Sequence, residues 1–241
     1  MSHGAIGLDD AGVALNGTPV WQHVTGSFAP GSMTAIAGAN GAGKSTLLRA
    51  ILGEVPLAAG KITLGGLRAQ DFGYLPQARI IDRAFPISVT DMVLSGAWRQ
   101  TGAFGAASPA VRQRAADALR RVGLEKQAGR MIDALSAGQF QRLLFARLLM
   151  TDATVIMLDE PFTALDAPTT QDLLALVREW HAQGRTIIAV LHDMHQIRTC
   201  FPHVVLLSGG QAIWGETGRI LTPGTLQRAY DTQPTWTGGP A

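Results

Sequence analysis

A glycine-rich run in the first fifth of the chain carries the clearest chemistry of the sequence. It reads Gly38, Ala39, Asn40, Gly41, Ala42, Gly43, Lys44, Ser45 and Thr46, which matches the pattern G-x-x-x-x-G-K-[ST]. The glycines let successive backbone N–H groups point inward at phosphate oxygens. Lys44 supplies a mobile cation for the outer phosphates, and Ser45 offers a hydroxyl to Mg²⁺. The run therefore predicts a phosphate loop that binds a nucleotide.

Two adjacent carboxylates, Asp159 and Glu160, follow the apolar run 155–158. Ligands of α/β proteins bind at the carboxyl ends of parallel strands, so this position suits a functional pair. One carboxylate can hold the Mg²⁺ shell, and the next can orient or deprotonate an attacking water. An ordinary acidic strand end is the alternative, but the phosphate loop already requires a partner for Mg²⁺.

A third run, 135–139, combines Ser136 with Gln139 three residues later, which is the pattern of a capping box. The serine hydroxyl, the free N–H groups and the positive end of the following helix form a second anion-binding surface. Taken alone, the run is better explained as a plain helix start. A pair of histidines, His192 and His195, has helical spacing for a metal site. No further cysteine or histidine completes such a site, so a structural role for the pair is preferred.

The elements that must position these residues alternate between strands and helices. Apolar and β-branched runs predict strands at 19–28, 33–37, 61–64, 154–158 and 186–191, and a hairpin with strands at 204–207 and 212–214. Caps and glycine stops predict helices at 44–52, 109–122, 137–150, 168–183 and 222–230. Residues 231–241 are expected to form a flexible tail. This order predicts an α/β fold around a phosphate loop.

Composition narrows the classes of protein further. The chain has 241 residues, 46% of them apolar, only 16% charged and a net charge of +2. No tract rich in lysine or arginine occurs, so a nucleic-acid partner is not expected. No apolar run reaches the ~18 residues that span a bilayer, and the start of the sequence does not resemble a secretory signal. Cys200, the single cysteine, cannot form an internal disulfide, which fits a reducing compartment.

The order of the motifs resembles that of the ABC transporter ATPase family over nearly the whole chain. The resemblance rests on six motifs: Walker A at 38–46, the Q-loop glutamine Gln77, the signature at 135–139 with Gln141 and Arg142, Walker B with the catalytic glutamate at 155–160, the D-loop at 164–166 and the switch histidine His192. It implies a P-loop NTPase with a RecA-like core, an antiparallel β subdomain and a helical subdomain. The helical subdomain is expected at about 78–150, inserted into a single nucleotide-binding domain that spans 1–230.

The resemblance also implies a mechanism and a partner. Two copies of the chain would stack head to tail, and the signature of one copy would cover ATP on the phosphate loop of the other. The signature residues are Ser136, Ala137, Gly138 and Gln139. Glu160 would act as general base and His192 would contact the γ-phosphate. Mg²⁺ would be held by Ser45, Gln77 and Asp159, and Asp166 of the D-loop would link the two sites.

Two positions depart from the pattern of the family. Ala137 stands where glycine is usual in the signature, which is a mild change at a helix start. Leu15 stands where the family usually places an aromatic ring against adenine, and leucine offers apolar contact without stacking. Trp21 is the other candidate for that contact.

The segment 82–93 and the ending 226–230 resemble those of zinc and manganese uptake ATPases. This resemblance implies an importer whose permease is a separate chain, a solute-binding protein outside the cell, and a peripheral location at the cytoplasmic face of the membrane. Phe85, Pro86 and Trp98, within the segment 78–101, would face the permease.

Three alternatives remain open: an importer of iron chelates, haem or cobalamin; a soluble ABC-type ATPase that acts on nucleic acid or ribosomes; and a simple P-loop kinase. The chain has neither a long coiled coil nor a second nucleotide unit, which disfavours the soluble class. A kinase would leave the signature, Gln77 and His192 unexplained.

Overall fold

The computed structural model describes residues 4–102 and 107–231, and the chain divides into two compact units. The first unit comprises residues 1–69 and 186–241, and the second comprises residues 70–185. The expectation of one nucleotide-binding domain over 1–230 with a helical insertion at about 78–150 stays a prediction. The expected tail at 231–241 lies outside the described residues, apart from Asp231 at the end of the last helix.

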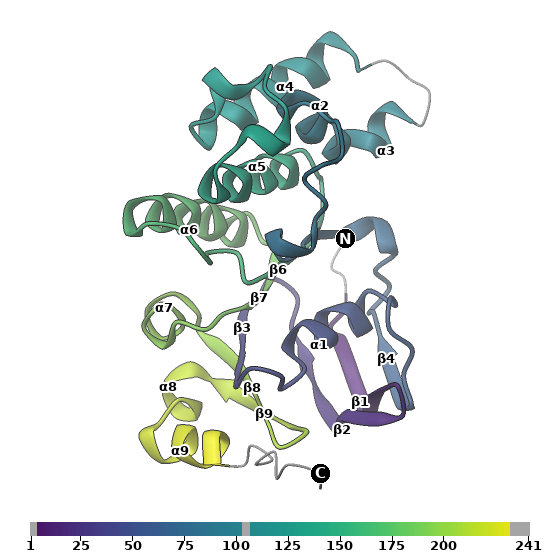
Figure 1. Cartoon of the computed structure of the whole chain (residues 1–241). Coiled ribbons are helices and arrows are strands. Elements are labelled where there is room, and N and C mark those ends of the chain that lie inside the picture. Colours follow the sequence, from purple (N-terminus) through teal and green to yellow (C-terminus); the bar gives the residue numbers. More distant parts are fainter. Residues whose placement is uncertain (1–3, 103–106, 232–241) are drawn as a thin grey trace, which may run out of the picture. The chain divides into compact units, whose positions relative to one another are not determined.

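The first unit contains an antiparallel sheet and a mostly parallel sheet (Figure 1). Strand order in the antiparallel sheet is β2-β1-β4, with β1 at Ile6–Leu15, β2 at Thr18–Phe28 and β4 at Ala59–Thr63. In the other sheet, β3 (Met33–Gly38) lies between β7 (Thr186–Val190) and β8 (His203–Ser208), and β9 (Gln211–Glu216) pairs with β8. Its helices are α1 (Lys44–Ile51), α7 (Met194–Cys200), α8 (Thr217–Ile220) and α9 (Pro223–Asp231).

Strands β3 and β7 are buried along their whole length, as continuous apolar runs predict for the centre of a parallel sheet. Ala35 pairs with Ala189 on one side and with Val204 on the other, which places β3 in the interior. The β8–β9 hairpin turns through Gly209 and Gly210, both with positive φ, as a two-residue hairpin requires. This arrangement places the loop that follows β3 at the carboxyl edge of the sheet.

The second unit joins a short parallel pair of strands to a group of helices (Figure 1). The strands are β5 (Phe72–Leu75) and β6 (Val155–Asp159), and Tyr74 pairs with Met157. The α-helices are α2 (Val89–Leu94), α3 (Trp98–Thr101), α4 (Pro109–Arg121), α5 (Ala137–Leu149) and α6 (Ala167–Ala182). The short 3-10 helices in the described residues are η1 (Ala69–Asp71), which begins at the last residue of the first unit's first segment, η2 (Ala78–Ile80), η3 (Ser95–Ala97), η4 (Glu125–Gln127) and η5 (Ile132–Ala134). Helices α2, α4 and α5 contact one another.

The predicted helices and strands are confirmed with shifts of at most two residues at their ends, and the α/β fold class holds. Strand β1 was not predicted, because Asp9 and Asp10 interrupt its alternation. The register shifts between Leu8 and Ala11, and Asp10 adopts a φ of 49°, so the strand bulges at this point. No helix within 4–102 or 107–231 is long and apolar enough to cross a membrane.

Candidate nucleotide site

The phosphate loop connects β3 to α1 in the first unit, as the sequence predicts. Gly43, the residue before the helix, has a φ of 86°, where a side chain would be strained. A Cβ at this position would also lie 2.5 Å from Val20 Cγ1 and 2.7 Å from Trp21 Cδ1. At Gly38 a Cβ would lie 2.4 Å from the carbonyl oxygen of Leu207. These two glycines are therefore required by both backbone conformation and space.

Lys44, the first residue of α1, is buried, with 5% of its surface exposed. Its Nζ donates hydrogen bonds to the carbonyl oxygens of Gly38 (3.0 Å) and Ala39 (2.8 Å). The ammonium is therefore folded back over the loop that it serves. Ser45 and Thr46 follow in the first turn, which contains no acidic residue, so the positive end of the helix is not neutralised there. The loop is chemically suited to bind an anion.

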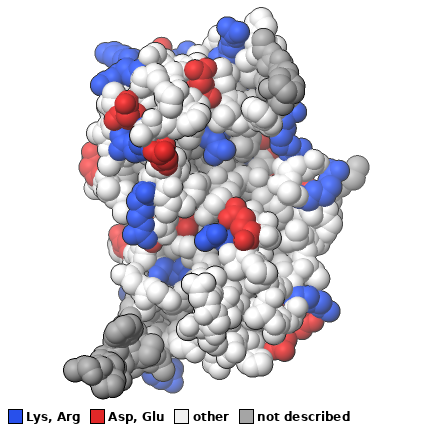
Figure 2. Space-filling view, turned by 45° about the vertical axis from the view of Figure 1, so that its right-hand side comes forward, with Lys and Arg blue, Asp and Glu red and all other residues white. Residues whose placement is uncertain are grey.

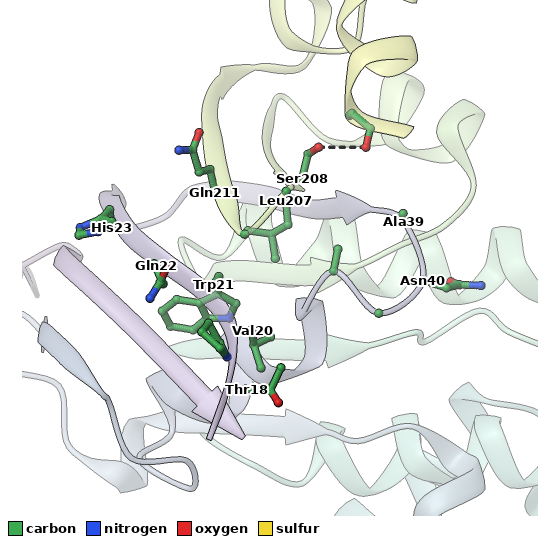
Figure 3. A pocket seen from close by; sticks show the side chains of 16 residues that line it. Thr18, Val20, Trp21, Gln22, His23, Ala39, Asn40, Leu207, Ser208 and Gln211 are labelled. Atoms are coloured by element: carbon green, nitrogen blue, oxygen red, sulfur yellow. Dashed lines mark hydrogen bonds between the residues drawn. The ribbon is translucent and has the colours of Figure 1, made fainter. Parts of the chain in front are cut away.

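A pocket of about 830 Å³ adjoins the loop within the first unit (Figure 3). Its walls come from the start of β2, the residues Ala39 to Ala42 of the loop, and the turn between β8 and β9. Trp21 lies in this wall but is 99% covered, with 1% exposed, so its ring is not presented for stacking. Leu15, by contrast, is 45% exposed. Of the two candidate adenine contacts, only Leu15 offers a surface.

The second unit brings together three of the predicted catalytic and metal-binding residues. Gln77 follows strand β5. Asp159 is the last residue of β6, and Glu160 is the residue after it. The amide nitrogen of Gln77 donates to Asp159 Oδ1 (3.2 Å) and to Glu160 Oε1 (3.0 Å). Gln77 and Asp159 are buried, with 8% and 2% exposed. Because β5 and β6 are parallel neighbours, residues more than 80 positions apart meet at their carboxyl ends.

Sequence reasoning missed two further contacts around this cluster. The hydroxyl of Tyr74 donates to Asp159 Oδ2 at 3.5 Å. The amide of Gln141, buried in α5, donates to the carbonyl oxygen of Pro161 at 2.7 Å. Gln141 therefore ties the helix of the signature to the loop that follows Glu160. Its place one turn into a helix offered no sequence signal for this contact.

The signature run begins α5 with a complete capping box, which confirms the predicted helix start. Ser136 Oγ accepts from the Gln139 backbone N–H at 3.2 Å, and Gln139 Oε1 accepts from the Ser136 N–H at 3.0 Å. Ser136 and Ala137 are exposed. A Cβ on Gly138 would lie 3.5 Å from Leu165 Cδ2, which is an ordinary contact. The signature is therefore a fully capped helix start at the surface of the second unit.

Asp166 of the D-loop begins α6. Its side chain accepts from the Thr169 backbone N–H at 2.8 Å, and Ala164 just before it has a φ of 62°. Hydrogen bonds from the Thr169 side chain and backbone lower the pKa of Asp166. The carboxylate is thus held ionised as a helix cap.

His192 lies in the first unit directly after β7 and is exposed. Its neighbour His195 belongs to α7, whose start is capped by the side chain of Asp193. Over residues 4–102 and 107–231, no three histidine, cysteine or acidic side chains gather into a metal-binding group.

Comparison with known proteins places this chemistry among transport ATPases. The family described as "ABC transporter" matches residues 21–163. The manganese transport system ATP-binding protein MntB of Bacillus subtilis is 37% identical over 227 residues, which cover 92% of this chain and 91% of that protein. The zinc transport system ATP-binding protein TroB of Treponema pallidum is 36% identical over 230 residues, covering 94% and 86%.

Solved structures agree with these relatives. An ABC transporter assigned to the metal-chelate type, in an inward-facing conformation, superposes with a TM-score of 0.82 at 30% identity, covering 94% of this chain and 89% of that one. An ATP-binding cassette of an ABC transporter in its ADP conformation superposes with a TM-score of 0.78 at 20% identity, covering 95% and 99%. At that identity the second likeness concerns the fold alone.

Proposed function

The chain belongs to the ABC transporter family of ATP-binding proteins, and from this we propose that it is the ATPase subunit of an importer for a divalent metal ion, manganese or zinc. The cluster of Gln77, Asp159 and Glu160 is the observation that carries the ATPase assignment. It supplies a buried metal-binding carboxylate and a candidate base, joined by one amide. The names of the relatives from Bacillus subtilis and Treponema pallidum support manganese or zinc as the cargo.

We propose that the phosphate loop and the paired carboxylates both take part in ATP hydrolysis, as the motif order of the family implies. Glu160 is the general base, which accepts a proton from the attacking water. Lys44 and the N–H groups of the loop bind the outer phosphates, and His192 contacts the γ-phosphate. These roles follow the motif order of the family and the chemistry of each side chain.

Mg²⁺ fits the oxygen donors that these motifs supply. Ser45 offers a hydroxyl, Asp159 a buried carboxylate and Gln77 an amide oxygen, and Mg²⁺ prefers such hard ligands together with substrate phosphates. When bound, the ion neutralises charge on the phosphates. In the chain itself, the contact of Gln77 with both acids holds the two carboxylates in place.

We further propose that two copies of the chain form a head-to-tail dimer. The exposed start of α5 at Ser136 then faces the nucleotide of the other copy, and Asp166 joins the two sites. Support comes from the exposure of Ser136 and Ala137 and from the complete capping box at this helix start. A two-fold dimer of this kind has two equivalent composite sites.

A separate permease would dock on the second unit. Phe85 and Trp98 expose 62% and 57% of their surfaces, and Ile80 exposes 65%, all between Gln77 and the signature. Large apolar side chains exposed in one segment favour a protein-binding surface. The solute-binding protein would act through the permease, and the chain would lie at the cytoplasmic face of the membrane. The face shown in Figure 2 carries scattered charges without a continuous basic area.

Purification of the chain from native membranes tests this proposal. We expect a membrane permease to co-purify, and Phe85→Asp to abolish both its recovery and transport-linked ATPase activity. Ile213→Asp, which changes a less exposed apolar side chain in the first unit (44%), is the control. Recovery of nucleic acid or ribosomes in place of a permease would favour the soluble class of ABC ATPase.

Uptake assays identify the cargo. Cells that lack this chain should lose uptake of radioactive Mn²⁺ or Zn²⁺ and regain it when the chain is restored. Loss of iron-chelate, haem or cobalamin uptake with unchanged metal-ion uptake would instead support the other importers.

A further inference from the structure

The orientation of the Gln77 amide is set by chemically unambiguous neighbours. On one side, Arg79 Nε donates to Gln77 Oε1 at 2.7 Å. On the other, Gln77 Nε2 faces Asp159 Oδ1 and Glu160 Oε1. A guanidinium only donates and an ionised carboxylate only accepts, so the reversed amide would oppose donor to donor and acceptor to acceptor. The three neighbours therefore select one orientation.

Arg79 reaches this position from only two residues further along the chain. It lies in η2, which begins directly after Gln77, and the Ile80 N–H donates to the Gln77 carbonyl oxygen at 3.1 Å. The residue is exposed, yet its side chain folds back onto a glutamine that is 8% exposed. The contact therefore joins the surface of the second unit directly to its catalytic cluster.

We propose that Arg79 is a positioning residue that latches Gln77 in a resting orientation, with the amide nitrogen on the two carboxylates and the amide oxygen on Arg79. The inference rests on the proposed function, in which the amide oxygen of Gln77 is a ligand of Mg²⁺. In the latched orientation that oxygen is engaged by a cation, and the amide nitrogen faces the acids. Ligation of a metal ion by this oxygen competes with the contact to Arg79, because the ion and the guanidinium are both cations that would share one oxygen.

The latch also bears on Glu160. An N–H that donates to Glu160 Oε1 at 3.0 Å competes for the lone pairs with which a base accepts a proton. Release of the amide would free that oxygen for a water and present Oε1 of Gln77 to the metal in one movement. Because Arg79 is exposed, a partner that attracts its guanidinium would open the latch.

Substitution of Arg79 tests the latch through metal affinity, independently of turnover. Mn²⁺ binding to the full chain with a non-hydrolysable ATP analogue would be titrated by electron paramagnetic resonance. We expect Arg79→Met to bind Mn²⁺ about three- to tenfold more tightly, as loss of one partly screened, charge-assisted hydrogen bond implies. Arg112→Met is the matched control, because it removes an arginine that donates to a backbone carbonyl, that of Ala107, in the same unit.

Repeating the Arg79→Met substitution in a Gln77→Ala variant distinguishes a latch that acts through Gln77 from a simple effect of the lost positive charge on Mn²⁺ affinity. If Arg79 acts through Gln77, Arg79→Met has no effect on Mn²⁺ affinity once Gln77 is alanine. The same tightening in both backgrounds, or unchanged affinity in Arg79→Met alone, would overturn the proposal. If the unsubstituted chain failed to bind the Mn²⁺–nucleotide complex at all, the proposed function itself would fall.

Discussion

At the scale of single residues, Glu160 combines an uncommon backbone conformation with a chemically central position. Its φ is 50°, in the left-handed region that residues other than glycine seldom adopt. Such strain persists where the surroundings hold it, and it concentrates at functional sites. Here the strand β6 ends just before Glu160, and Gln77 binds its side chain. The strained position thus coincides with the candidate base.

Glu160→Gln tests that assignment. The amide keeps the shape of the side chain but cannot accept a proton from water, so we expect ATP turnover to fall at least ~100-fold. ATP binding should change by less than about threefold, because the proposed phosphate contacts come from the loop 38–46 and not from Glu160. Turnover would be followed by phosphate release, and binding by a fluorescent ATP analogue.

Glu54→Gln is the matched control, because Glu54 is exposed and pairs only at the surface with Arg49. Full turnover in Glu160→Gln would require another base.

At the scale of elements, the close approach of η3 to α5 supports the helix that carries the signature. A Cβ on Gly96 would lie 2.1 Å from the carbonyl oxygen of Arg147 and 2.9 Å from Met150 Cβ. Nearby, Arg147 Nε donates to Ser95 Oγ at 3.1 Å. Burial lowers the pKa of Arg147, so this hydrogen bond compensates a partly desolvated cation. The close approach of the α5 backbone to Gly96 therefore leaves no room for a side chain at residue 96.

We expect Gly96→Ala to lower the free energy of unfolding by about 1–3 kcal/mol, because the backbone of α5 must move away from the added methyl group. Urea denaturation followed by circular dichroism would measure the change. Gly129→Ala adds the same methyl group where no atom lies within 4 Å, and it should stay within about 0.5 kcal/mol of the unsubstituted chain. Equal stability of the two variants would contradict the packing argument.

At the scale of the whole molecule, the proposed dimer makes each active site a composite of two chains. The exposed signature of one chain would complete the phosphate loop of the other. A variant damaged at Glu160 and a variant damaged at Ser136 therefore have defects in different halves of a site. One of the two sites in a mixed dimer contains both defects, and the other contains neither.

Mixing Glu160→Gln with Ser136→Arg should consequently restore ATPase activity that neither variant shows alone. With equal amounts and random pairing, about half of the dimers are mixed, and each has one intact site. We expect roughly a quarter of the activity of the unsubstituted chain if the two sites act independently. Activity of the mixture equal to the average of the separate variants would argue against composite sites.

Much of the fold was predictable because its signals are local. Strands β3, β6 and β7 are continuous apolar runs, and the starts of α4, α5 and α6 carry capping side chains that bond within three residues. The strands and α-helices that escaped prediction are the bulged strand β1, the four-residue strand β5 and the short helices α2, α3, α7 and α8. In each of these, either a bulge or shortness leaves too few residues to establish a period.

The sequence by itself determined the phosphate loop, the paired acids and the capped signature, because each depends on residues adjacent along the chain. Tertiary structure decided the rest of the site. Pairing of β5 with β6 brings Gln77 to the two acids. Packing beside Gly43 buries Trp21, so Leu15 is the exposed candidate for contact with adenine. The contact of Arg79 with Gln77 is close in sequence but carries no motif. The tertiary structure defines this contact, because the carboxylates that follow β6 bind the amide nitrogen of Gln77 and leave its oxygen to Arg79.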